Sequence, residues 1–254
     1  MSNFNDSMKA KVAPAAINTG LARPAGTGST NDLLYTLWGG TAGSINDRGN
    51  AYFNAPSGPA FRAASSTTTI TGGGGFTLAA PVGTVAGDVL IVQFFVVIDS
   101  KSGVVGTAPA GWTQRGTGDD LNSPHIVWRT FTRVATGSDS FVWSGGSNWT
   151  APLAAAMIAV SGGTAVDVVG TRTLTATASS VTTTTSPTLL VGLWATFQNT
   201  TAAPASMTAR SNVSHIGLSQ VIATQSLSAS GATGTRVSPT SSSLLRFAQL
   251  IAVK

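Results

Sequence analysis

Residues 125–134 read His-Ile-Val-Trp-Arg-Thr-Phe-Thr-Arg-Val, a run of β-branched and aromatic residues with little turn propensity. Successive side chains of a β-strand point to opposite faces. Ile126 and Trp128 therefore share one face of this segment, and Val127 and Phe131 share the other. The composition and the spacing together predict a strand over the whole stretch.

Similar short runs, separated by Gly, Pro, Asn and Ser, follow one another from Ser66 onward. Strands are predicted at 66–71, 76–80, 88–98, 125–134, 139–143, 153–161, 172–178, 188–198, 206–210, 217–227, 233–237 and 244–253. The nearly continuous apolar character of 188–198 and 244–253 is typical of strands buried on both faces. Helix-period patterns long enough for alternating strands and helices are absent. We therefore expect an all-β fold in which residues 66–254 form an antiparallel β-sandwich or a jelly-roll-like domain.

The residues before this domain differ in composition. Residues 1–27 are rich in Ala, Pro, Gly and Thr, which predicts an irregular N-terminal arm. The Pro and Gly content of residues 54–65 predicts a linker. Between them, at 28–53, we expect a short helical hairpin.

The hairpin is predicted from a repeated pattern, G-S-x-N-D, at 28–32 and 43–47. Ser at a helix cap and Asp in the first turn both favour a helix start, and an apolar stretch follows each copy. Two short helices, near 30–38 and 45–53, follow from this. They either form a subdomain that packs on the main body or dock on another chain, since so small a hairpin cannot bury all its own aromatic rings. In the second case the assembly anchor consists of Leu33, Leu34, Leu37, Trp38, Ile45, Tyr52 and Phe53.

The composition argues against an enzyme. Charged residues make up only 9% of the 254 residues, there is no Cys or Glu, and only two His occur. The chain therefore has no thiolate for nucleophilic or metal chemistry. His125 and His215 are expected to be surface or capped histidines, and no nucleotide-binding or nucleophile-elbow motif is present. We expect no cofactor.

Asp119 and Asp120 are the only adjacent carboxylates, in the sequence Gly-Thr-Gly-Asp-Asp-Leu-Asn. This stretch is predicted to be a loop, where Asn122 could add a third oxygen ligand for calcium. A solvated turn is the favoured interpretation. A polysaccharide-degrading enzyme that uses one of the two aspartates is the weakest of the functional alternatives.

The aromatic and basic residues suggest two kinds of binding surface. Arg129 and Arg133 share a strand face with Phe131, but a solvent-facing edge explains them without nucleic acid, and no nucleic-acid partner is expected. Trp112 and Trp149 lie in predicted loops, where an exposed indole could stack on a sugar. The competing interpretation is that they plug the ends of the sandwich.

A membrane partner is not expected either. The N-terminal residues lack a basic start followed by an apolar core, so no signal peptide is predicted. The longest apolar run, from Val89 to Ile98, is far shorter than the roughly 20 residues that cross a bilayer.

Two stretches resemble known proteins. The G-S-x-N-D segments at 28–38 and 43–53 resemble short repeats appended to virion proteins of tailed bacteriophages. The block that runs from Gly87-Asp88-Val89-Leu90 through Pro109-Ala110-Gly111-Trp112 to Trp128-Arg129 and 154–157 is similar to a β domain of phage tail and capsid-associated proteins. The resemblance implies a non-enzymatic virion component, either a head decoration, a head fibre or a minor tail protein.

The expected partners follow from the resemblance and the sparse charge. A surface of hydroxyl and methyl groups keeps a free monomer poorly soluble but packs well against copies of itself, so a homo-oligomer is predicted. The N-terminal region would anchor it to capsid or tail subunits in a virion assembled in the bacterial cytoplasm. The alternative is a receptor- or carbohydrate-binding adhesion module of a phage tail, with Trp112 and Trp149 on a host surface glycan.

Overall fold

The computed structural model describes residues 58–69, 75–98, 108–120, 125–137, 139–144, 152–197, 200–239 and 246–254. The chain divides into two units, Met1–Ala55 and Pro56–Lys254, and every described residue belongs to the second unit. The predicted arm at 1–27 and the predicted hairpin at 28–53 lie outside the described residues.

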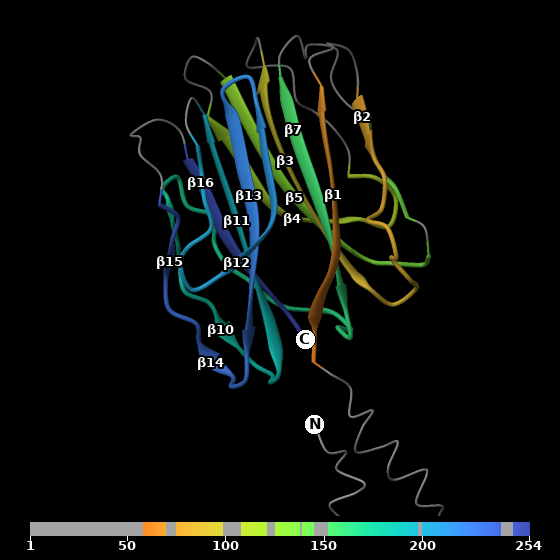
Figure 1. Ribbon diagram of the computed structural model, residues 1–254, viewed down its shortest axis with the longest axis vertical. Helices are drawn as coiled ribbons and strands as arrows, with labels where there is room; N and C mark the ends of the chain where they lie inside the picture. Colours follow the sequence, from red (N-terminus) through yellow and green to blue (C-terminus); the bar gives the residue numbers. More distant parts are fainter. Residues whose placement is uncertain are drawn as a thin grey trace, which may run out of the picture. The chain divides into compact units, whose positions relative to one another are not determined.

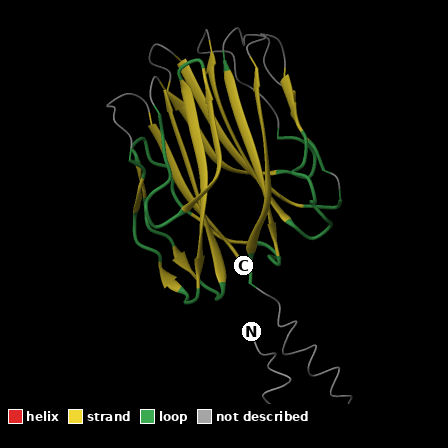
Figure 2. Ribbon diagram, viewed as in Figure 1, coloured by secondary structure: helices red, strands yellow, loops and turns green. Residues whose placement is uncertain are grey.

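The described part of the chain is all-β, without a helix (Figures 1 and 2). A first five-stranded sheet has the order β1 (Ala60–Thr69), β7 (Leu153–Ser161), β3 (Val89–Ile98), β5 (His125–Val134) and β4 (Thr113–Asp120). A second has the order β12 (Thr208–His215), β13 (Leu218–Leu227), β11 (Thr188–Phe197), β16 (Arg246–Val253) and β8 (Val166–Val169). Every pairing in both sheets is antiparallel.

The remaining strands form three two-stranded ribbons. The first joins β2 (Gly75–Leu78) to β6 (Phe141–Ser144). The other two join β9 (Thr177–Ala178) to β15 (Arg236–Val237), and β10 (Thr182–Thr183) to β14 (Gly231–Ala232).

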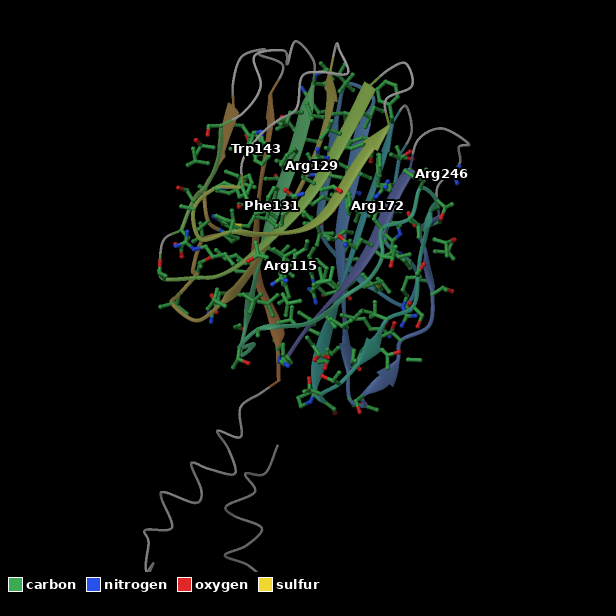
Figure 3. The ribbon with its side chains drawn as sticks, turned by 180° about the vertical axis from the view of Figure 1, so that it is seen from behind. Arg115, Arg129, Phe131, Trp143, Arg172 and Arg246 are labelled. Atoms are coloured by element: carbon green, nitrogen blue, oxygen red, sulfur yellow. The ribbon has the colours of Figure 1, made fainter. Side chains whose placement is uncertain are left out.

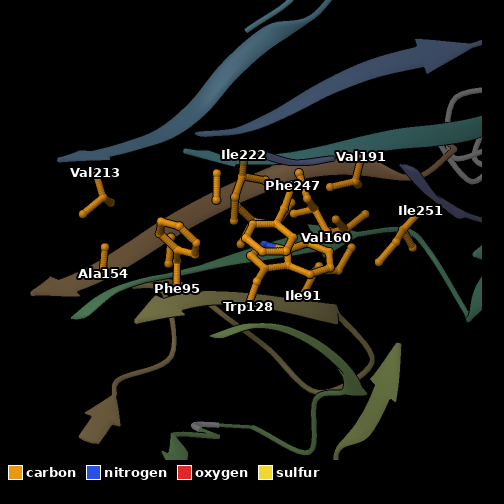
Figure 4. Packing of buried hydrophobic residues seen from close by; sticks show 14 of the residues in the cluster. Ile91, Phe95, Trp128, Ala154, Val160, Val191, Val213, Ile222, Phe247 and Ile251 are labelled. Carbon is orange, nitrogen blue, oxygen red and sulfur yellow. The ribbon is translucent and has the colours of Figure 1, made fainter. Parts of the chain in front are cut away.

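The two sheets pack face to face around a central core to which both contribute (Figure 4). The Trp128 ring of the first sheet stacks on the Phe247 ring of the second, with centroids 5.7 Å apart and planes 3° from parallel. The larger side chains of this central core are Ile91, Phe95, Ile126, Trp128, Ile158, Leu189, Leu193, Leu218, Ile222, Phe247 and Ile251. This arrangement is consistent with the predicted β-sandwich.

The outer face of each sheet is also buried, because other segments cover it. On the first sheet, Phe94 and Phe131 pack against Phe141 and Trp143 of the β2–β6 ribbon. These residues belong to the first outer core, which also includes Trp112. On the second sheet, Leu190 and Trp194 lie in a second outer core with Ala178, Val181 and Met207. Burial on both faces explains why β3, β11 and β16 are apolar at nearly every position.

Each edge strand of the two five-stranded sheets contains one β-bulge, an extra residue that interrupts the pairing register. The extra residue is Arg62 in β1 and Arg115 in β4 of the first sheet. In the second sheet it is Arg210 in β12 and Asp167 in β8. All four bulges therefore carry a charged side chain.

Several boundaries differ from the sequence predictions. The strands at 125–134 and 153–161 are confirmed residue for residue. The predicted linker is wrong for residues 60–65, which pair with β7 as part of β1. Strands β4 and β8 and the two-residue strands β10 and β14 were not predicted. The predicted strand at 172–178 is wrong except for residues 177–178, which form β9.

Candidate functional site

The aspartates whose side chains are described each stabilise the local backbone. Asp88, whose side chain is 3% exposed, lies 2.7 Å from Arg62 Nε. The same carboxylate accepts a hydrogen bond from Val85 N at 3.0 Å, which closes the turn before β3. This carboxylate therefore joins the bulge of β1 to the start of β3 and leaves no free acid facing a cleft.

Asp139 closes the turn that follows β5. It accepts hydrogen bonds from Thr136 N at 2.5 Å and Thr136 Oγ1 at 2.8 Å, and Arg133 Nη2 lies 2.8 Å away. Burial alone would raise the pKa of Asp139, but these bonds and the Arg133 charge outweigh it, so the pKa is lowered. The carboxylate therefore stays ionised, which does not suit a general acid.

Asp167 has the same role at the bulge of β8. It accepts hydrogen bonds from the backbone N and the hydroxyl of Thr184, and Lys254 Nζ lies 3.5 Å away. Burial would raise the pKa of Asp167, but the Thr184 bonds and the Lys254 charge lower it overall. Asp88, Asp139 and Asp167 thus lie in three separate ion pairs and do not converge.

The predicted loop at Asp119 and Asp120 is wrong, because both residues are in β4, opposite Val127 and Ile126 of β5. Their side chains lie outside the described residues, and so does Asn122. Among the side chains that the structure describes, no group of three potential ligands could hold a metal ion.

The arginines of β5 do not form a solvent-facing edge, which corrects the sequence interpretation. Strand β5 lies between β3 and β4, inside the first sheet. Phe131 is fully buried, and Arg129 is only 7% exposed, with its Nη1 donating to Trp128 O at 3.0 Å (Figure 3). Arg133 is paired with Asp139. These residues therefore do not form the exposed basic patch that nucleic acid needs.

Trp112 occupies the position expected of a plug. Its side chain lies in the first outer core and is 6% exposed. The ring meets Phe141 edge to face, with centroids 5.1 Å apart. No broad face of the indole is left for a sugar, so the structure favours the plug over the glycan contact for Trp112. Trp149 and all the predicted assembly-anchor residues lie outside the described residues.

A shallow depression lies at the turn between β12 and β13. It has a volume of about 430 Å³ and is lined by Thr200, Ser214, His215, Ile216, Gly217 and Leu218. The Nε2 atom of His215 is buried there without a hydrogen-bond partner among the described residues. Among the described residues that line the depression there is no carboxylate to orient a catalytic histidine. His125 is the first residue of β5, and its side chain is not described.

Ile216 is unusual because its φ is 40°, a conformation that β-branched residues rarely adopt. Together with Gly217, at φ 77°, it forms the two-residue connection between β12 and β13. Such connections favour Asn-Gly, since both residues need positive φ. The Ile216 side chain is 59% exposed, so no packing in the described part of the chain explains the choice.

Comparison of the chain with protein-family models, curated proteins and solved structures found no match. In the described part of the chain, no helix is long and apolar enough to cross a membrane.

Proposed function

We propose that the chain is a non-enzymatic structural protein of a bacteriophage virion, either a capsid decoration, a minor capsid protein or a tail-associated protein. In this proposal residues 1–53 attach the chain to capsid or tail subunits, and the β-sandwich is displayed on the particle. The resemblance of the 28–38 and 43–53 segments to virion-protein repeats motivates the proposal. The geometry of the body supports it.

The observation that carries most weight is how the body uses its few charges. Only 9% of residues are charged, and the described aspartate side chains are all engaged in ion pairs and turns. Hydroxyls dominate the more exposed strand positions, as in Ser66 and Thr68 of β1 and Thr208 and Ser214 of β12. Ser and Thr lose little side-chain entropy when they are ordered against a neighbour. This chemistry suits contact with other protein subunits better than conversion of a substrate.

The burial of Trp112 makes the adhesion alternative less well supported, because that alternative relied on two exposed indoles. A mechanism through Asp119 or Asp120 gains no support either, since the two aspartates are in a strand.

The proposal is tested by deletion of residues 1–55, which removes the first unit and leaves β1 whole. The shortened chain should keep its β-type circular dichroism spectrum and its cooperative unfolding, but should no longer co-purify with phage particles. Unchanged incorporation into particles would refute attachment through the N-terminal region.

A full-length variant separates attachment from folding. The double substitution Trp38→Ala and Tyr52→Ala should reduce incorporation without changing the thermal stability of the body. The matched control is Val82→Ala, which truncates a 92% exposed apolar side chain on the body and should incorporate normally. Equal loss of incorporation in both variants would contradict the assignment of the anchor.

A further inference from the structure

The two five-stranded sheets have the same topology. All strands of the first sheet come from residues 60–161, and all strands of the second come from 166–253. Read from one edge, the orders are β1-β7-β3-β5-β4 and β8-β16-β11-β13-β12. In both, the first strand of the half lies at the edge beside the last strand of that half. Five strands of one half therefore have counterparts in the other, in the same sequence order.

The pairing registers coincide as well. The bulge of β4 lies two residues after Thr113, which pairs with Thr132 of β5. The bulge of β12 likewise lies two residues after Thr208, which pairs with Thr224 of β13. The bulge residues make the same hydrogen bond. Arg115 Nε donates to Thr132 Oγ1 at 2.7 Å, and Arg210 Nε donates to Thr224 Oγ1 at 2.8 Å.

The turn before each of these strands repeats in sequence and in geometry. Residues 109–115 read Pro-Ala-Gly-Trp-Thr-Gln-Arg, and residues 204–210 read Pro-Ala-Ser-Met-Thr-Ala-Arg. Trp112 N donates to Pro109 O at 3.0 Å, and Met207 N donates to Pro204 O at 2.9 Å. Trp112 and Met207 each lie in the outer core of their own sheet.

The last strand of each half shows the same correspondence. Residues 157–160 read Met-Ile-Ala-Val, and residues 250–253 read Leu-Ile-Ala-Val. Val160 pairs with Val89 at the start of β3, and Val253 pairs with Leu189 near the start of β11. Identical residues therefore occupy identical places in the two registers.

From this agreement of topology, bulges, hydrogen bonds and sequence, we propose that residues 58–254 are a fused dimer. Two tandem copies of one module are joined by the short connector 162–165, and the inner face of each sheet is a protein–protein interface whose partner is the other copy. The two sheets exchange no strand, so each sheet is built from one copy alone.

The two inner faces have diverged so that each fits the other. Across one row, the first sheet presents Ala154, Phe95 and Trp128, and the second presents Phe247, Ala195 and Gln220. A large residue in one copy thus corresponds to a small or polar one in the other. The counterpart of Trp128 in the other copy is Gln220, and the counterpart of Phe247 is Ala154. Between two identical copies, Trp128 would meet Ala154, or Gln220 would meet Phe247, so the observed ring stack could not form. The fitted partner of each face is therefore the other copy and not a duplicate of itself.

The interface also contains hydrogen bonds that fix how the halves meet. Gln93 Nε2 donates to Trp194 O at 3.0 Å, across the central core. Gln249 Oε1 accepts from Thr130 Oγ1 at 2.9 Å. Both amides are almost fully buried, so their bonds would be lost if the sheets shifted relative to one another.

The equivalence makes a specific prediction about the ends of the module. Ser161 pairs with Ala60, and at the corresponding place Lys254 N donates to Ala165 O at 3.0 Å. The end of the second copy should therefore connect to the start of the first as easily as the native connector joins the first copy to the second. The test is a chain with the copies in reversed order: residues 1–57, then 163–254, one added glycine, then 58–162. All native residues are kept, and the new connector has the native length.

The reversed chain should be soluble and give the same far-UV circular dichroism spectrum, with a thermal midpoint within about 5 °C of the control. The control keeps the native order and carries one added glycine between Gly162 and Gly163. If the control folds and the reversed chain does not, the two halves are not equivalent modules and the proposal is wrong.

A second experiment tests the interface without rearranging the chain. A site for a specific protease is inserted between Gly162 and Gly163 of the full-length protein, and the chain is cleaved there. The two fragments should co-elute, reassemble after dilution from urea, and show a thermal midpoint that rises with protein concentration, because unfolding is then coupled to dissociation. Fragments that elute and melt separately, or that do not reassemble, would overturn the fused-dimer interface.

Discussion

Replacement of Trp112 by alanine tests whether this ring holds the fold together or contacts a ligand. Trp112 is 6% exposed and packs edge to face on Phe141. An aromatic side chain buries about 150–250 Å², which at about 25 cal/mol per Å² gives roughly 4–6 kcal/mol as an upper estimate. Measured losses for Trp-to-Ala changes in cores are about 3–5 kcal/mol. We expect Trp112→Ala to lower the free energy of unfolding by about 3–5 kcal/mol.

The measurement is urea denaturation of the full-length protein, followed by far-UV circular dichroism so that the signal does not depend on the deleted indole. For a domain of this size, a loss of that magnitude lowers the thermal midpoint by roughly 10 °C. Trp112→Phe should lose roughly half as much, since it keeps a ring against Phe141. Leu174→Ala is the control: this leucine is 55% exposed, and its truncation should change stability by less than about 0.5 kcal/mol.

The opposite result is equally informative. If Trp112→Ala unfolds at the same urea concentration as the unchanged protein but reduces adsorption of particles to cells, the ring is a ligand contact and the packing interpretation fails.

Three further predictions follow from the hydrogen-bonding groups and the strained turn. Because the pKa values of Asp139 and Asp167 are lowered from 3.8 in the folded state, their stabilisation is complete above that pH and is lost as the pH falls further. Replacing both with Asn should flatten the decline in the urea midpoint between about pH 6 and 2, and an unchanged acid profile would contradict this. Ile216→Asn should raise the free energy of unfolding by about 1 kcal/mol, since Asn tolerates positive φ. Ile216→Ala should raise it little. A loss of stability with Asn would show that the Ile216 side chain is needed. Gln249→Leu should lower the free energy of unfolding by about 3 kcal/mol, because Arg115 O and Gly170 O lose their donor. The same change at the exposed Gln114 should be nearly neutral. Equal urea midpoints for the two variants would show that the buried amide is dispensable.

The strands that could be predicted from the sequence are those whose own composition favours them. The 125–134 segment alternates faces, and its two sides enter different cores, as Trp128 and Phe131 show. The continuous apolar runs of β11 and β16 correctly indicated burial on both faces. In these segments local propensity and tertiary burial agree.

Strand β4 could not be predicted from its composition. Its sequence, Thr-Gln-Arg-Gly-Thr-Gly-Asp-Asp, is poor in β-formers and rich in turn residues, and only the pairing with β5 makes it a strand. A signal was nevertheless present. The repeat of Pro-Ala-x-x-Thr-x-Arg at 109–115 and 204–210 relates β4 to β12, whose start falls in the predicted strand 206–210. The repeat therefore indicates a strand after Trp112 that the composition of β4 alone does not.

The predicted linker failed for a related reason. Pro56, Gly58 and Pro59 do indicate an irregular segment, but the small residues that follow pair with the alanine-rich strand β7. For the candidate site, the sequence could show that Trp112 follows a Gly turn but could not show whether its ring points outward. That depends on the β2–β6 ribbon, whose Phe141 is distant in sequence.

The four bulges bear on how the two sheets avoid pairing with other molecules. A strand at the edge of a sheet can recruit a strand from another molecule, and continued recruitment produces fibres. Here a chain with 9% charged residues places one charged side chain at the bulge of each edge strand: Arg62, Arg115, Arg210 and Asp167. The interrupted register opposes such addition at all four edges. The partly exposed charges of Arg62, Arg115 and Arg210 would also have to be desolvated, whereas the Asp167 side chain is already buried. Edge-to-edge addition of a second copy should therefore be disfavoured, so that these sheets would not seed amyloid-like growth.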